Sequence, residues 1–246
     1  MKKLACYLIM ISLIAVSPFI LQSCDDDPEV YYVRMVTLKL DGNDKYLLET
    51  DNGDKINIVS SDVRWYKPEK DQRVLIYYDL LSKDDEKTYN IHLEHISGIL
   101  TKTVEELTVD DEEKYGNDKV YIEKMWIGGD YLNVRFRFYL PYYTKHRVSL
   151  VKNTIVENPD DDYIYLEYRY NNEDDITPAM RRSYVSFDLG EYAPSVADKK
   201  YKGIKVKINS VKNGEVTIPL DFGENSTEDR NIENPEEFDP AEGKIK

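Results

Sequence analysis

Cysteine and histidine are scarce in this chain, and their scarcity excludes several kinds of chemistry. Only two of the 246 residues are cysteines, Cys6 and Cys24, and both lie in the first 24 positions. The rest of the chain therefore forms no internal disulfide and offers no thiol nucleophile. A serine hydrolase would have to take its base from three histidines, and no Gly-x-Ser-x-Gly motif is present. We expect a protein that is not an enzyme and has no cofactor.

The three histidines give no metal-binding motif either. His92 and His95 lie three residues apart on a predicted strand, so they point to opposite faces and cannot share one ion. His146 begins another predicted strand, where a hydrogen-bonded structural role is the favoured interpretation. The acidic runs lack the spacing of a calcium loop, so we predict no metal site. A carboxylate-based hydrolase is the least favoured alternative, because any acidic chain contains paired carboxylates.

Positive charge is outnumbered in this sequence. The chain has 33 Lys and Arg residues against 47 Asp and Glu residues, which gives a formal net charge of −14 at pH 7. Phosphate backbones are repelled by a protein of this charge. We therefore expect no nucleic-acid partner.

Long apolar runs are absent except near the N-terminus. Residues 4–21 are almost wholly apolar and follow Lys2 and Lys3, as in a secretory signal. The run is also close to the length of about 20 residues that a membrane-spanning anchor helix needs. Residues 21–24, Leu-Gln-Ser-Cys, favour the first interpretation, because they resemble a lipobox, in which a lipoprotein signal peptidase cuts just before the cysteine.

This pattern predicts a signal peptide at residues 1–23 and lipid attachment at Cys24. Two or three acyl chains, such as palmitate, hold a protein stably to a membrane, so we expect a membrane partner and a lipid-anchored place at the outer membrane. Residues 24–30 are rich in aspartate and form an acidic tether. The tether is either a solvated spacer or a signal for export to the cell surface. The second alternative is implied by its resemblance to the export signal of surface lipoproteins.

Alternating apolar and polar residues dominate the rest of the chain. Residues 131–140, for example, place Leu132, Val134, Phe136 and Phe138 on one face of an extended strand. Residues 163–170 and 202–211 repeat this period of two, broken by Gly, Asn, Asp and Pro turns. The fold class is therefore predicted to be all-β, with antiparallel sheets that bury one face.

The turn signals divide the strands into two groups. Five short strands in residues 31–106 suit a five-stranded OB-like barrel, and about seven strands in residues 119–222 suit an antiparallel β-sandwich. A charged stretch at residues 107–118 is predicted to link the two domains. Residues 223–246 are acidic and poor in apolar residues, which predicts a loose tail.

Several segments resemble the NigD-like lipoproteins. They are the Trp-Ile-Gly-Gly-Asp-Tyr-Leu-Asn-Val stretch at 126–134, Lys-His-Arg-Val-Ser-Leu-Val at 145–151, and shorter pieces at 67–74, 99–102, 116–118 and 184–188. The resemblance implies an N-terminal OB-like domain, a C-terminal β-sandwich and a lipoprotein signal. It implies little chemistry, beyond an immunity role against a bacteriocin that the family name suggests.

Aromatic residues are the remaining candidates for a binding surface. The chain has 21 tyrosines and two tryptophans, and aromatic rings stack on sugars and peptides. Trp65, Tyr66, Tyr142 and Tyr143 lie in predicted loops beside prolines, where binding residues tend to collect. We therefore expect an interaction module for an envelope protein, with a glycan-binding accessory lipoprotein as the alternative. An ordinary tyrosine-rich sheet surface is the plainer interpretation of these rings.

Overall fold

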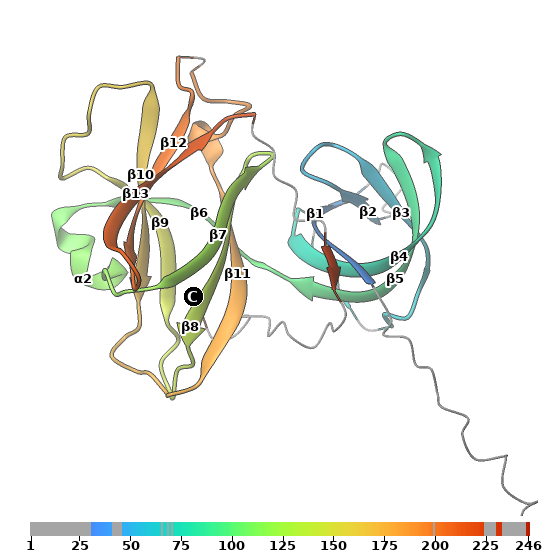
Figure 1. The fold of residues 1–246 in the computed structure, drawn as a ribbon, viewed down its shortest axis with the longest axis horizontal. Helices are drawn as coiled ribbons and strands as arrows, with labels where there is room; N and C mark the ends of the chain where they lie inside the picture. Colours follow the sequence, from blue (N-terminus) through green and yellow to red (C-terminus); the bar gives the residue numbers. More distant parts are fainter. Residues whose placement is uncertain are drawn as a thin grey trace, which may run out of the picture.

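The computed structural model describes residues 31–40, 46–64, 66–67, 69, 71–198, 200–223, 230–232 and 245–246. The predicted signal, Cys24 and the acidic tether lie outside these residues. Two all-β domains lie side by side, a small barrel (blue to teal) and a larger body (green to red) (Figure 1). None of the described helices has the length and apolar character needed to cross a membrane.

The first domain is a closed five-stranded barrel. Its strands are β1 (Tyr31–Leu40), β2 (Tyr46–Glu49), β3 (Lys55–Ser61), β4 (Arg73–Asp85) and β5 (Thr88–Gly98). They follow the order β1-β2-β3-β5-β4, and β4 pairs back onto β1 to close the sheet. Closure hides the strand edges that an open sheet would expose. The prediction of an OB-like barrel is confirmed.

The second domain is an eight-stranded sheet folded into a sandwich. Its strands are β6 (Leu100–Leu107), β7 (Tyr121–Gly128), β8 (Tyr131–Tyr139), β9 (Arg147–Asn153), β10 (Tyr163–Asn171), β11 (Met180–Asp188), β12 (Gly203–Ser210) and β13 (Gly214–Asp221). Their order is β13-β12-β10-β9-β6-β11-β8-β7. Leu132, Val134, Phe136 and Phe138 of β8 are buried between the layers with the alternate residues of β10 and β12, so the predicted inward faces are confirmed.

Strand β6 joins the two layers of the sandwich and was misplaced by the sequence. Its residues 100–103 run parallel to β11, and its residues 104–107 run parallel to β9. The expectation that residues up to 106 belong to the barrel is therefore wrong. Both partners follow β6 by more than 40 residues, and such non-local parallel pairing leaves no local sequence signal.

The predicted linker at 107–118 is part of the sandwich instead. It contains a 3-10 turn, η1 (Val109–Asp111), and a short helix, α2 (Glu112–Tyr115). The ring of Tyr115 is buried against Leu107 and Val151, which anchors this segment to the outer face of β9. The charged composition of residues 107–118 gave no sign that Tyr115 is buried. The burial of Tyr115 fixes how this segment packs on the sandwich.

The predicted loose tail is ordered at two places. Strand β14 (Arg230–Ile232) pairs with the start of β1. Further on, Ile245 is buried in the sandwich core and forms a β-bridge with His146. Ile245 is a single apolar residue near the end of a polar segment, so it hardly changes the average composition from which the tail was predicted to be loose.

A buried ion pair of the barrel lies at the boundary with the sandwich. The guanidinium of Arg73 on β4 is fully buried and holds the carboxylate of Asp51 by two hydrogen bonds of 2.5 and 3.2 Å. It also donates to Asn133 Oδ1 of β8 across the domain boundary at 3.2 Å, and it lies 4.6 Å from the ring centroid of Tyr131. Gly128 is required here, because a Cβ at that position would come within 2.0 Å of Asp51 Oδ2.

An apolar cluster completes this joint between the domains. Its buried members are Val33, Met35, Leu75, Tyr77, Ile99, Trp126 and Tyr184. Four of the segments that carry the family resemblance thus meet at the domain boundary, namely 67–74, 99–102, 126–134 and 184–188.

Candidate functional site

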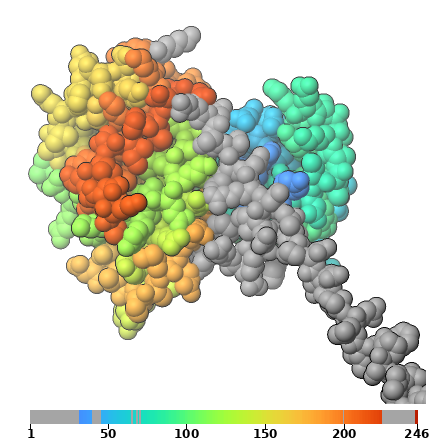
Figure 2. Space-filling model, in the orientation of Figure 1, coloured from blue at the N-terminus to red at the C-terminus, as the bar shows by residue number. Residues whose placement is uncertain are grey.

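The most exposed aromatic side chains of the sandwich lie at one of its ends, in the loop between β8 and β9. Tyr142 is 61% exposed and Tyr143 is 94% exposed. Their ring centroids are 6.0 Å apart and the ring planes differ by 29°, so the two rings are stacked. The end of the sandwich where β8 meets this loop is the narrow yellow-green projection of Figure 2. We call Tyr142 and Tyr143 the tyrosine tip.

Asp175, in the loop before β11, holds the backbone beneath the tyrosine tip. Its carboxylate accepts the backbone N–H groups of Tyr142 at 3.1 Å and Tyr143 at 2.5 Å, and also that of Thr144. These hydrogen bonds, led by the one from Thr144, hold the pKa of Asp175 below its usual value. The rings are therefore exposed while the backbone that carries them is fixed.

His146 supports the same loop from inside. Its ring is fully buried, with Nδ1 2.7 Å from the hydroxyl of Tyr170 and Nε2 2.6 Å from the backbone oxygen of Asp175. A carbonyl oxygen only accepts, so Nε2–H donates to Asp175, and in the neutral ring the Tyr170 hydroxyl then donates to Nδ1. Burial raises the pKa of Tyr170, which keeps that hydroxyl protonated. His146 is thus a hydrogen-bonded structural residue, as predicted.

Of the other predicted aromatic pair, the structure describes Tyr66 alone, and this ring is not exposed. Tyr66 is half-buried against the barrel core, and its hydroxyl donates to Gln72 Oε1 at 2.6 Å. Trp65 lies outside the described residues. Among the described members of the four residues predicted to bind a ligand, Tyr142 and Tyr143 lie together as an accessible surface. Ligand binding by these residues stays a prediction.

His92 lies in a polar cluster that sequence reasoning missed. Nδ1 is 2.7 Å from Ser60 Oγ, and Nε2 is 3.2 Å from Glu94 and 3.7 Å from Asp62. His92 and Glu94 are two apart on β5 and share a face, which was the available signal. Asp62, His92 and Glu94 are the side chains that could hold a metal ion in the described chain. The ring already has Ser60 Oγ beside Nδ1 and the Glu94 carboxylate beside Nε2.

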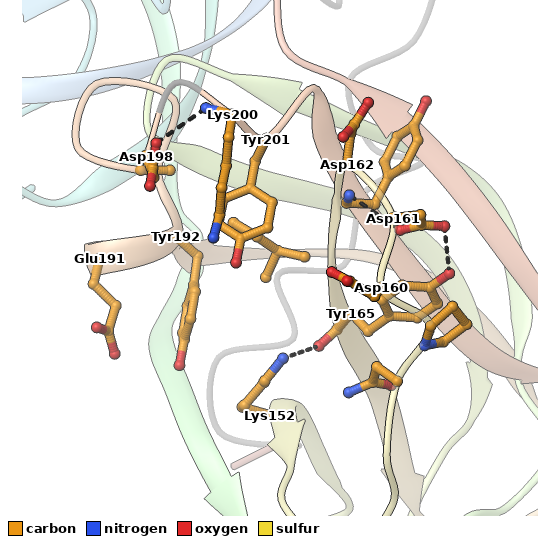
Figure 3. Close-up of a pocket in the computed structure, with 15 residues that line it drawn as sticks. Lys152, Asp160, Asp161, Asp162, Tyr165, Glu191, Tyr192, Asp198, Lys200 and Tyr201 are labelled. Atoms are coloured by element: carbon orange, nitrogen blue, oxygen red, sulfur yellow. Dashed lines mark hydrogen bonds between the residues drawn. The ribbon is translucent and has the colours of Figure 1, made fainter.

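A pocket at the opposite end of the sandwich was also missed. It has a volume of about 640 Å³ and lies between the β9–β10 loop and the segment that joins β11 to β12 (Figure 3). Tyr192 and Tyr201 line one side, while Tyr165 and Lys152 line the other. These residues are up to about 50 positions apart in the sequence, so spacing alone could not unite them.

Family comparisons agree with this architecture of barrel followed by sandwich. The NigD-like N-terminal OB domain matches residues 35–99, and the NigD-like C-terminal beta sandwich domain matches residues 102–222. The chain is therefore a two-domain all-β protein in which an OB barrel is followed by a β-sandwich. The chain belongs to the NigD-like family.

Solved structures share the fold over most of the chain. A protein of unknown function from Bacteroides vulgatus is 30% identical, with a TM-score of 0.74 over 87% of this chain and 99% of that chain. A candidate toxin-related protein from Parabacteroides distasonis is 27% identical, with a TM-score of 0.64 over 79% and 93% of the two chains.

A third solved structure, a NigD-like immunity protein from Bacteroides caccae, is 19% identical, with a TM-score of 0.57 over 76% of this chain and 91% of that chain. At that identity it shows the fold alone. No protein with a curated description matches the chain.

Proposed function

We propose that the protein is a non-enzymatic lipoprotein of the cell envelope that binds a protein partner through the tyrosine tip. One observation carries the proposal: two stacked tyrosine rings are held in solvent by a backbone fixed on Asp175. Rigid exposed aromatics supply large contact areas at a small cost in conformational entropy, and they are frequent anchors of protein interfaces. The lipid on Cys24 would keep this surface at the membrane where the partner is met.

Purified protein without residues 1–23 would test partner binding in extracts of the cell envelope. We expect one discrete protein to be retained in stoichiometric amount by the wild type and lost with Tyr142→Ala plus Tyr143→Ala. Tyr121→Ala is the matched control, since Tyr121 is an exposed tyrosine on β7. Reproducible absence of any retained protein, or equal retention by the double variant, would contradict the proposal.

An immunity role is the more specific form of this function. It is supported by the names of two proteins of similar structure, one a toxin-related protein and one an immunity protein. Immunity by binding predicts that cells without this protein become sensitive to spent medium of their parent strain. Wild-type protein should restore resistance and the double tyrosine variant should not. Unchanged survival of the deletion cells would rule out this role.

A further inference from the structure

The pocket at the far end of the sandwich has features that the tyrosine tip lacks. Strand β9 runs from the tip to this pocket, a separation of about 20 Å for its seven residues. The volume of about 640 Å³ falls within the range of about 300–1,000 Å³ that is usual for small-ligand sites. The two ends of the sandwich are therefore separate surfaces.

Lys152 is a half-buried cation of this pocket that has no carboxylate beside it. Its ammonium donates to the backbone oxygen of Tyr165 at 3.3 Å, and no carboxylate of the described residues lies within ion-pair distance. Burial lowers the pKa of Lys152, with no charged neighbour to offset the effect. An anionic group placed here would restore the stabilisation that water provides to an exposed lysine.

The neighbouring lysines are already paired. Lys205 binds Asp161, and Lys202 lies 2.5 Å from Asp162. These contacts neutralise two of the three consecutive aspartates on the pocket rim. The other cation of the lining, Lys200, is exposed, and its ammonium lies 4.8 Å from the ring centroid of Tyr201. Lys152 is therefore the less exposed of the two lining cations that have no carboxylate beside them in the described part of the chain.

The rest of the lining suits a polyhydroxylated ligand with an apolar face. Tyr192 and Tyr201 present their rings to the pocket, and rings of this kind stack on the C–H faces of sugars (Figure 3). Asp160, Glu191 and Asp198 lie on the rim, where carboxylates accept hydrogen bonds from hydroxyl groups. The same carboxylates repel a doubly charged phosphate, so a single carboxylate is the better match for one lysine.

We propose that this pocket binds a hexuronate, with the sugar carboxylate on Lys152 Nζ and the sugar ring against Tyr192 and Tyr201. The site is independent of the tyrosine tip and of the protein partner proposed for it. Rim carboxylates orient the sugar hydroxyls, while Lys152 distinguishes an acidic sugar from a neutral one.

Calorimetric titration with digalacturonate and with methyl glucuronide tests the proposal, and the neutral disaccharide galactobiose and the tripeptide Gly-Gly-Tyr serve as comparisons. We expect at least one hexuronate to bind the wild type, and galactobiose and the tripeptide to bind more weakly. Lys152→Met should weaken hexuronate binding by about 10-fold or more, because it removes a charge-assisted hydrogen bond. Lys152→Arg keeps the charge and should retain most of the affinity.

Two control variants separate this site from other effects. Lys212→Met removes an exposed lysine at the β12–β13 turn, and Tyr143→Ala alters the tyrosine tip; both should leave the affinity unchanged. Circular dichroism during heating shows that each variant is folded. The proposal is overturned if neither hexuronate binds at about 10 mM, if galactobiose or the tripeptide binds equally well, or if Lys152→Met has no effect.

Discussion

Single side chains decide how the tyrosine tip is presented. Asp175 accepts three consecutive backbone N–H groups, although the residue lies more than 30 positions from them. Tyr142 and Tyr143 were predicted as loop aromatics from their place after Pro141, and their exposure agrees. The contribution of Asp175 was not predictable, because a carboxylate within an acidic run carries no mark of its distant backbone partners.

Asp175→Ala should free the backbone of the tyrosine tip. The three N–H groups lose their acceptor, so their hydrogen exchange should speed up by about 10-fold or more. The Asp110→Ala variant has the same charge change at an exposed site in η1 and should leave these amides unaffected. Unchanged exchange at Tyr142, Tyr143 and Thr144 in the Asp175 variant would show that other contacts fix the loop.

Acid should have the same effect through protonation of Asp175. Its folded pKa lies below the usual 3.8, so its stabilisation is present above that value and is lost as the pH falls through the folded pKa. The amide resonances of Tyr142 to Thr144 should therefore stay constant from neutral pH to about pH 4 and change only below it. A midpoint above the usual aspartate value would contradict the hydrogen bonding described for this carboxylate.

Elements in this fold were predictable when their pattern was local. The alternation in β8, β10 and β12 and the Gly-Gly-Asp turn between β7 and β8 all correspond to observed structure. Strand β6 and the ordered end of the tail were not assigned, because their partners lie far away in the sequence. Ile245 shows this most clearly, as its β-bridge partner is His146, about 100 residues earlier.

Removal of Ile245 and Lys246 should destabilise the sandwich. The backbone of Lys246 donates to His146 and accepts from Val148, and the side chain of Ile245 is buried. Loss of these contacts should lower the free energy of unfolding by about 2–5 kcal/mol in urea titrations. Lys246→Ala keeps both backbone hydrogen bonds and should have little effect. Equal stability of the truncated and full chains would show that the final bridge contributes nothing.

At the scale of the whole molecule, the joint between barrel and sandwich depends on Arg73, which pairs with Asp51 inside the barrel and donates to Asn133 of the sandwich. Arg73→Met leaves the Asp51 carboxylate with its buried partner removed, which should cost about 3–5 kcal/mol. Calorimetry should then resolve two transitions where the wild type shows one, because the domains lose their polar link. Lys39→Met breaks an exposed ion pair with Asp71 in the same barrel and should cost less than about 1 kcal/mol. A single unshifted transition for the Arg73 variant would contradict the role of the joint.

The proposed lipid anchor also belongs to the scale of the whole molecule. Cys24→Ala should move the protein from the membrane fraction to the soluble fraction, because the acyl chains have no other site of attachment. Mass spectrometry of the wild-type N-terminal peptide should find Cys24 as the first residue with its lipid. An uncut leader or an unmodified sulfur would contradict the lipoprotein assignment.

The central claim is that the tyrosine tip is the surface on which a protein partner binds. Its most direct test replaces Tyr143 with the photo-crosslinker p-benzoylphenylalanine in living cells, with replacement of the exposed Val109 as the matched control. Irradiation should give one discrete protein adduct at position 143 and none at position 109. No adduct at position 143, or the same adducts at both positions, would contradict the claim.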